Sequence, residues 1–155
     1  MKRFRDNGER LCSFQDEFQV QCPRCNSRAT IHRIAPDNTD LFAPHRFSCT
    51  ACGSSKDWSG GATWMGCSYG EPVDSYFHYP LWLQAPCCGY TLWAYNLRHL
   101  EFIEAFVKAK LRERKPNEQY GWSNRSLFSR LPKWIQSRKN RDRILKAIAK
   151  IRESL

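Results

Sequence analysis

Two pairs of cysteines with the same spacing are the residues that most directly predict chemistry. Cys22 and Cys25 enclose Pro-Arg, and Cys49 and Cys52 enclose Thr-Ala. A two-residue spacer places both thiolates of a pair on one tight turn, and two such turns side by side present four soft ligands in a tetrahedron. The pattern predicts one bound Zn²⁺, while an iron site, a redox dithiol or metal-free thiols are the alternatives for the same residues.

The residue that follows each cysteine pair supports the metal site. These residues are Asn26 and Gly53, and Asn and Gly are the types that most easily adopt the left-handed backbone such a turn needs. Four thiolates also fill every coordination position of a tetrahedral Zn²⁺. We therefore expect a metal that stabilises the fold and takes no part in catalysis.

Cys87 and Cys88 lie in the segment Ala-Pro-Cys-Cys-Gly, which looks like a degenerate metal-binding turn with Ala85 in place of its first ligand. The simplest interpretation is that the two cysteines form a two-residue hairpin turn and pack as small apolar residues. A second metal or redox site at Cys87 or Cys88 is the alternative, but neighbours on a strand point to opposite faces. The residues that would complete such a site are Cys12, Cys67 and His78.

A cysteine nucleophile activated by a histidine is the enzymatic alternative. The candidate bases are His32, His45, His78 and His99. Nothing in the sequence brings any of them to a particular cysteine. The chain also lacks a phosphate-binding Gly-x-x-x-x-Gly-Lys-Ser/Thr loop and a paired-His metalloprotease motif, so we expect a protein that is not an enzyme.

Basic residues are concentrated in the last third of the chain, whose formal net charge is +10. From Arg98 onward there are 16 basic and 6 acidic residues, whereas residues 1–97 contain nine of each. Near the end, basic residues recur at a helical spacing, which predicts contact with nucleic-acid phosphates. Solubility of an exposed helix is the other explanation for such a stripe. The predicted contact residues are Arg138, Lys139, Arg141, Arg143, Lys146 and Lys150.

The elements that must position these residues follow from hydrophobic periodicity. Alternation of apolar and polar side chains predicts strands over 17–22, 29–34 and 45–49, each beside a cysteine pair. Aromatic runs over 76–85 and 90–95 predict a hairpin. Helical periodicity predicts one helix that is capped by Asn96, has Leu111 on its apolar stripe and ends before Pro116, and another over 140–155.

The predicted fold class is therefore α+β, in three consecutive parts. An N-terminal extension over 1–16 precedes a zinc ribbon of antiparallel hairpins, which is joined to an aromatic-rich β-hairpin over 17–95. Residues 96–155 form a C-terminal pair of basic amphipathic helices. We expect these parts to fold as one cooperative domain.

The compartment is predicted from the termini and the cysteines. The basic N-terminal residues are not followed by an apolar run, so we expect no signal peptide. No stretch approaches the roughly 18 apolar residues of a membrane span. Eight cysteines without a secretory signal favour metal ligands in a reducing compartment, and the cytoplasm is the predicted location.

Four segments together resemble a family of small bacterial proteins labelled "TFIIB-type zinc ribbon-containing", and related chains are labelled as the primosomal replication-restart helicase. The likeness extends from about Glu17 onward. It implies a zinc-ribbon fold with Cys22, Cys25, Cys49 and Cys52 as ligands. It does not imply helicase activity, because a nucleotide-driven motor needs a phosphate loop. The segments are Cys22-Pro-Arg-Cys25, Cys49-Thr-Ala-Cys52, Pro80-Leu-Trp-Leu-Gln-Ala-Pro-Cys-Cys-Gly-Tyr-Thr-Leu-Trp-Ala-Tyr-Asn96 and Arg130-Leu-Pro-Lys-Trp134.

The sequence thus predicts a zinc-binding protein that contacts RNA, DNA or a nucleoprotein through its basic C-terminal helices. The alternative is an adaptor that binds a protein partner and uses the zinc as a structural support. A membrane partner or a small-molecule substrate is not expected.

Overall fold

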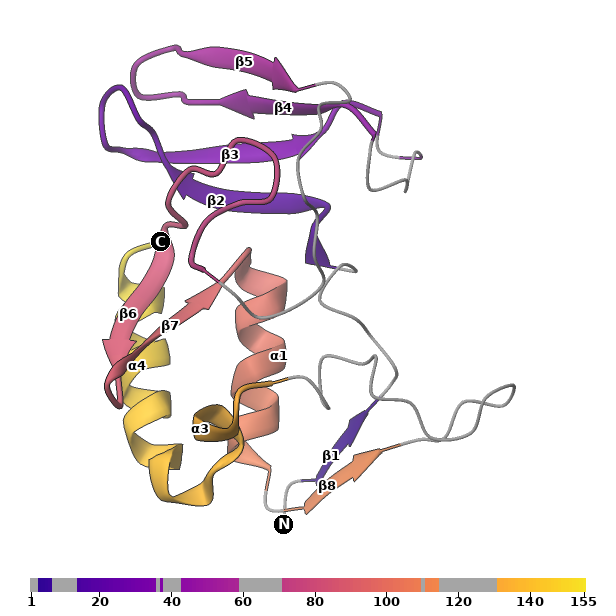
Figure 1. The fold of residues 1–155 in the computed structure, drawn as a ribbon, viewed down its shortest axis with the longest axis vertical. Helices are drawn as coiled ribbons and strands as arrows, with labels where there is room; N and C mark the ends of the chain where they lie inside the picture. Colours follow the sequence, from indigo (N-terminus) through magenta and orange to yellow (C-terminus); the bar gives the residue numbers. More distant parts are fainter. Residues whose placement is uncertain are drawn as a thin grey trace.

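The structure is a computed structural model that describes residues 3–6, 14–35, 37, 43–58, 71–109, 111–114 and 131–155, with 3–6 and 111–114 described by their backbone. Figure 1 shows a four-stranded sheet at one end of the long axis, and a β-hairpin with the longer helices below it. The expected α+β class, with antiparallel sheets and a C-terminal helix, is confirmed.

The four-stranded sheet carries both cysteine pairs. Its antiparallel strands are β2 (Glu17–Gln21), β3 (Arg28–Arg33), β4 (His45–Ser48) and β5 (Ser55–Trp58), in that order. The register places Phe18 opposite Ile31 and Ile31 opposite Phe47, and all three are buried. Polar side chains alternate with them on the other face, as the period of two predicts. The three strands expected beside the cysteines are thus present.

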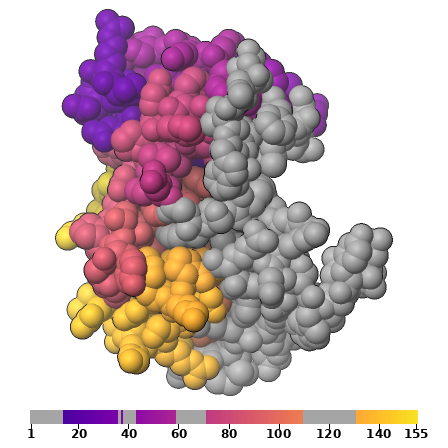
Figure 2. Space-filling model, viewed as in Figure 1, coloured from indigo at the N-terminus to yellow at the C-terminus, as the bar shows by residue number. Residues whose placement is uncertain are grey.

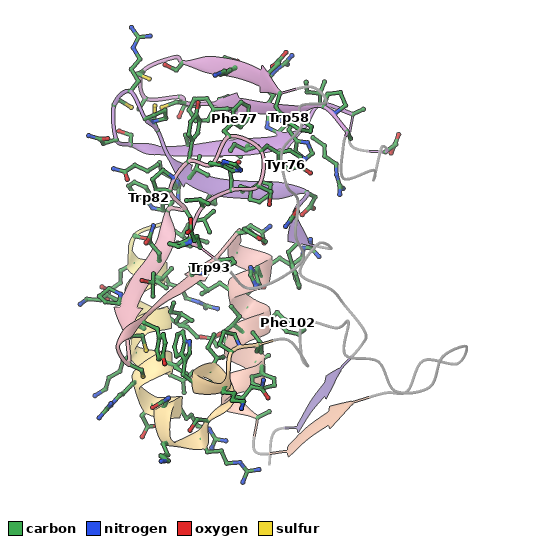
Figure 3. The ribbon with its side chains drawn as sticks, viewed as in Figure 1. Trp58, Tyr76, Phe77, Trp82, Trp93 and Phe102 are labelled. Atoms are coloured by element: carbon green, nitrogen blue, oxygen red, sulfur yellow. The ribbon has the colours of Figure 1, made fainter. Side chains whose placement is uncertain are left out.

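The segment 71–82 covers the apolar face of this sheet (Figures 1 and 3). Isolated bridges pair Val20 with Leu81 and Val73 with Pro80, so the segment is held by backbone contacts without forming a long strand. Tyr76 lies within 4.8 Å of Trp58, centroid to centroid, and its ring stacks on His45 at 3.7 Å. The strand predicted over 76–85 is therefore wrong in its first half, because these residues form an aromatic cover instead.

The hairpin consists of β6 (Leu83–Cys87) and β7 (Tyr90–Ala94), which pair from Leu83 with Ala94 to Cys87 with Tyr90. Its turn residues are Cys88 and Gly89, whose φ angles are 56° and 80°. Such a pair of positive φ angles matches the twist of a two-residue hairpin. The turn expected at Cys87 and Cys88 is thus displaced by one residue, since glycine takes a left-handed position more easily than Cys87 would.

Helix α1 (Leu97–Lys108) begins where the sequence predicts, with Asn96 as its N-cap. It ends earlier than predicted, because β8 (Leu111–Arg114) follows and pairs in parallel with β1 (Arg3–Asp6). Leu111 therefore belongs to a strand and not to the helix stripe. Helix α1 also carries two basic and two acidic residues, so the prediction of two basic helices holds for the last helix alone.

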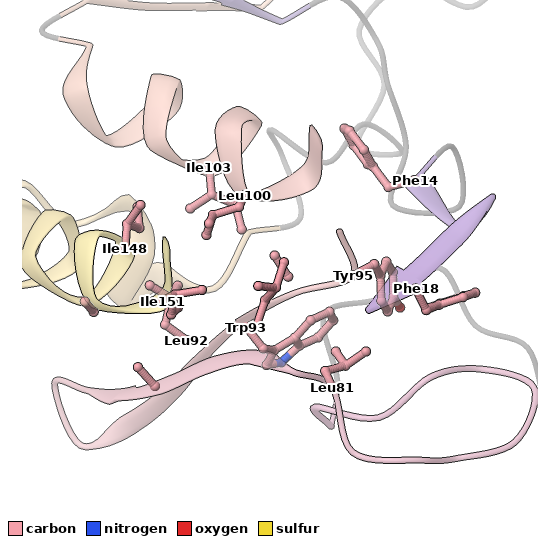
Figure 4. Packing of buried hydrophobic residues seen from close by; sticks show 14 of the residues in the cluster. Phe14, Phe18, Leu81, Leu92, Trp93, Tyr95, Leu100, Ile103, Ile148 and Ile151 are labelled. Atoms are coloured by element: carbon pink, nitrogen blue, oxygen red, sulfur yellow. The ribbon is translucent and has the colours of Figure 1, made fainter. Parts of the chain in front are cut away.

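The C-terminal region contains α3 (Lys133–Gln136), a 3-10 turn η2 (Arg138–Asn140) and α4 (Arg141–Glu153). Helix α4 packs on β6 and α1. Figure 4 shows Ile148 and Ile151 of α4 facing Leu92 of β7 and the Leu100 side of α1. Leu155, the last residue of the helix predicted over 140–155, is 43% exposed because the helix ends before it.

A continuous cluster of buried apolar residues extends from Phe14 to Ile151 and includes residues of the sheet, the hairpin and the helices. In the space-filling view, residues from 71 to the β6–β7 hairpin lie between the four-stranded sheet and α3 on one face (Figure 2). No helix in the described part of the chain has the length and apolar character needed to cross a bilayer.

Candidate functional site

The first cysteine pair lies on the turn between β2 and β3. The Cys22 N–H donates to the Ser27 carbonyl at 2.8 Å, and the Asn26 N–H donates to the Cys22 carbonyl at 2.9 Å. Asn26 has a φ of 63°. This left-handed residue reverses the chain after Cys25, so both sulfurs of the pair point to the same side of the turn.

The second pair repeats this geometry between β4 and β5. The Cys49 N–H donates to the Ser54 carbonyl and the Gly53 N–H donates to the Cys49 carbonyl, both at 2.9 Å. Gly53 has a φ of 77°. The two turns therefore contain the same two backbone hydrogen bonds. The cysteine spacing and the residues Asn26 and Gly53 predict this match.

The four sulfurs of these turns lie within 4.8 Å of one another. The Sγ atoms of Cys22 and Cys52 are 3.8 Å apart, and those of Cys25 and Cys49 are 3.5 Å apart. Ligands at about 2.3 Å from a tetrahedral Zn²⁺ would be about 3.8 Å apart. The donor set and its spacing therefore fit a metal ion with four thiolate ligands.

Hydrogen bonds and burial shift the pKa of three of these thiols in different directions. Hydrogen bonds from Ser54 lower the pKa of Cys52 to about 6, and those from Ser27 lower the pKa of Cys25. The Cys52 backbone favours the Cys49 thiolate, but burial and the neighbouring Cys25 outweigh it and raise the pKa of Cys49 to about 11. Cys49 would therefore be protonated at neutral pH without a metal, and a cation that binds its thiolate would release that proton.

Among the described residues, these four cysteines are the group of His, Cys, Asp or Glu side chains arranged to hold a metal ion. Cys12 and Cys67, considered for a second site, lie outside the described residues. The Cys87 and Cys88 sulfurs lie 3.4 Å apart. The expectation that they point to opposite faces is wrong, because Cys88 is in the turn and not in the strand.

The six predicted contact residues fall into different environments. Arg138 and Lys139 are exposed in η2 and precede α4. Arg141 is half-buried, and its Nη2 donates to the Ala109 carbonyl at 3.1 Å. Arg141 therefore ties α4 to the end of α1, and its guanidinium is engaged inside the protein.

Arg143, Lys146 and Lys150 lie on one exposed side of α4. They line a cleft of about 570 Å³ whose opposite wall is the β6–β7 turn with Cys87 and Cys88. None of the three basic side chains forms an ion pair with a residue that the structure describes. The stripe predicted from sequence thus contributes three residues to one basic cleft.

An exposed aromatic side chain borders the same turn. Tyr90 is 58% exposed, and its ring stacks on Trp134 with centroids 5.2 Å apart and planes 5° apart. The aromatic pair thus begins two residues beyond Cys88 in the chain. The sequence showed the aromatic run but could not indicate that Tyr90 faces solvent.

Of the four candidate histidines, His32 and His78 are exposed and the other two are buried. His45 and His99 are buried, and their Nδ1 atoms are hydrogen-bonded to the backbone of Ala43 and Tyr95 respectively. Burial lowers the pKa of both imidazoles. No histidine lines the cleft at Cys88.

Asp74 is a residue whose role the sequence analysis missed. Its buried carboxylate accepts backbone N–H groups from Tyr76 at 2.8 Å, Phe77 at 2.7 Å and Tyr79 at 2.6 Å. Burial raises the pKa of this carboxyl, and the three N–H groups oppose that shift. These hydrogen bonds hold the aromatic segment over the sheet. The sequence feature that could have indicated this role is an Asp at the start of a turn.

Comparisons with protein-family models, curated proteins and solved structures give no match to this chain.

Proposed function

We propose that this chain is a non-enzymatic zinc-ribbon protein that binds RNA or DNA through the basic face of α4. The observation that carries the zinc assignment is the cluster of four sulfurs within 4.8 Å on two matched turns. A tetrahedron of four thiolates is closed, so the ion stabilises the two hairpins and activates no water. The resemblance to bacterial zinc-ribbon proteins favours the same assignment, and a reducing bacterial cytoplasm suits four free thiolates.

The nucleic-acid part of the proposal is supported by charge that is not neutralised within the described protein. Arg143, Lys146 and Lys150 are spaced over seven residues, or about 10 Å of helix. One strand of a duplex presents a phosphate every ~3.4 Å along its axis, so these side chains can meet about three phosphates. Tyr90 adds an exposed ring on which a base can stack.

The test is binding of fluorescent single-stranded and duplex RNA and DNA oligonucleotides to the zinc-loaded chain, followed by anisotropy. We expect binding at about 50 mM salt that weakens steeply by about 200 mM. Neutralising the cleft with Arg143→Gln, Lys146→Gln and Lys150→Gln together should remove most of the affinity and reduce the salt slope by about 3. Arg141 is left unchanged because its side chain supports the fold.

The matched control neutralises three exposed basic residues of the ribbon, with Arg24→Gln, Arg28→Gln and Lys56→Gln. This variant has the same net charge as the cleft variant and should bind almost as well as the unmodified chain. Absence of binding at about 50 mM salt would refute the nucleic-acid proposal. If both variants lose the same amount of nucleic-acid affinity, binding is a non-specific effect of net charge and not a property of the cleft. Capture of one protein partner that persists after nuclease treatment would favour the adaptor alternative.

A further inference from the structure

The turn between β6 and β7 brings two thiols together in a way that a strand does not. Cys87 is the last residue of β6, and Cys88 follows with a φ of 56°. The left-handed backbone rotates the Cys88 side chain toward that of its neighbour, and the two Sγ atoms are 3.4 Å apart. An adjacent pair of free thiols is therefore held at reacting distance by the turn itself.

The two thiols differ in accessibility. Cys87 is 8% exposed and belongs to the apolar cluster, and its burial raises the pKa of the thiol to about 12. Cys88 is more exposed and borders the cleft. The geometry therefore makes Cys88 the thiol that an incoming reagent meets, with Cys87 directly behind it.

The cleft in front of Cys88 is positively charged. Arg143, Lys146 and Lys150 line it from α4, and Glu153 contributes one negative charge to the same lining. These cations attract anions, and a concave wall raises the local concentration of such a ligand.

Thiol chemistry fits this pair better than a second zinc site. The described residues offer no third His, Cys, Asp or Glu ligand to these sulfurs. Two thiols and three cations match a small reagent that is anionic and that reacts with sulfur.

We propose that Cys88 and Cys87 form a thiol–disulfide exchange site for small anionic disulfides. The Cys88 thiolate attacks one sulfur of the disulfide, so that a mixed disulfide forms and one thiol leaves with the proton that Cys88 lost. Cys87 then attacks the Cys88 sulfur, which closes a Cys87–Cys88 bond and releases the second thiol with the Cys87 proton. Two protein thiols are oxidised and one disulfide is reduced to two thiols. The proposal does not depend on nucleic-acid binding.

The experiment treats the zinc-loaded full chain with glutathione disulfide (anionic), 2-hydroxyethyl disulfide (neutral) or cystamine (cationic) and maps the products by peptide mass spectrometry. Each rate is divided by the rate for a short peptide with the sequence of residues 84–91, which removes the intrinsic reactivity of each reagent. We expect the normalised rates to fall from anionic to cationic by roughly tenfold or more at low salt, and to converge at high salt. The first product should be a mixed disulfide on Cys88, followed by the Cys87–Cys88 disulfide.

Three variants make the result specific. Cys87→Ser should stop the reaction at the mixed disulfide, and Lys146→Glu should reduce the preference for the anionic reagent. The control, Lys56→Glu on the exposed side of β5, changes the net charge of the protein by the same amount outside the cleft. It should leave the preference for the anionic reagent unchanged. Equal normalised rates for the three reagents, or first modification of another cysteine in the unmodified chain, would overturn the proposal. The unmodified chain is the reference if Cys87→Ser fails to fold.

Discussion

At the scale of single residues, the metal-binding turns depend on two left-handed positions, Asn26 and Gly53. The space around Gly53 is open, because a Cβ added there would meet no atom within 4 Å. An alanine at this position would therefore cost backbone strain and no steric clash. Such strain is worth about 1–2 kcal/mol for an L-residue in the left-handed region.

Gly53→Ala is expected to lower the free energy of unfolding by about 1 kcal/mol without changing the metal content. Urea unfolding of the metal-loaded chain measures the first quantity, and metal analysis measures the second. Asn26→Gly is the control, since it relieves the same strain in the matching turn and should not destabilise by a comparable amount. An unchanged urea midpoint for Gly53→Ala would contradict the geometry of the second turn.

His99 makes stability depend on pH. Burial, and to a smaller extent Arg98, lowers the pKa of its imidazole to about 3 from an ordinary 6.5. Its Nδ1 accepts the Tyr95 N–H at 3.0 Å, so the folded protein holds a neutral ring that protonates on unfolding. The unfolded state thus binds more protons between these two pKa values, and stability is lost as the pH falls below 6.5.

Between pH 7 and about 5.5 this one group should cost about 1 kcal/mol of stability. The thiol ligands also titrate, so the measurement is the difference in pH dependence between the unmodified chain and His99→Asn. Asn keeps an acceptor near the Nδ1 position but does not titrate in this range. Equal pH dependence of the two proteins in denaturant unfolding would show that His99 is not held neutral.

The four proposed ligands were predictable because their spacing is local and each turn fixes its own geometry. The sequence could not predict the roles of Asp74, His99 and Tyr90, because these roles depend on burial and on segments distant in sequence. Phe14, for example, stacks on His99 at 5.0 Å although the two residues lie in different parts of the chain.

At the scale of elements, Asn96 connects the start of α1 to the entry of β2. Its Oδ1 accepts the His99 N–H at 2.9 Å, which is the expected N-cap bond. Its Nδ2 donates to the carbonyls of Phe14 and Glu17, both at 2.8 Å. The side chain is 5% exposed, so these bonds are not readily replaced by water.

Asn96→Asp separates the two roles, because aspartate caps a helix as well as asparagine does but cannot donate to the two carbonyls. We expect a loss of about 2 kcal/mol or more, as two buried acceptors lose their partners and a charge faces them. Thermal and urea unfolding measure the loss. If Asn96→Asp is as stable as the unmodified chain, Asn96 acts as a cap and does not join the two elements.

Periodicity predicted the ribbon strands and the start of α1, since these elements bury one regular face. It failed where long-range pairing decides the structure. Leu111 continues the helical period but lies in β8, whose partner β1 is at the other end of the chain. The segment 71–82 has no regular period because Asp74 and stacked aromatic rings, rather than a ladder of strands, hold it in place.

At the scale of the whole molecule, the candidate metal site and the helices share one apolar cluster. The sheet faces the segment 71–82, which leads directly into β6 and then into the packing of α4. The sequence predicted basic residues on the last helix, but it could not predict that the β6–β7 turn closes them into a cleft with Cys88. That arrangement depends on how the hairpin packs on α4.

The shared cluster predicts that metal removal disturbs more than the ribbon. A chelator in reducing buffer should cause loss of β-sheet circular dichroism and a large fall in the melting temperature of the whole chain, because metal binding contributes folding free energy. Restoring Zn²⁺ should recover both signals. If metal removal lowers the melting temperature of the ribbon alone and the helices melt at an unchanged temperature, the two parts fold independently.

The zinc assignment is tested by the metal content of the chain purified under reducing conditions. We predict one Zn²⁺ per chain, lost in Cys22→Ser and Cys49→Ser, whose sulfurs belong to the buried side of the cluster. Cys88→Ser, the control outside the cluster, should retain the ion. A chain that is folded, free of zinc and unchanged in stability by Cys49→Ser would contradict the zinc-ribbon account.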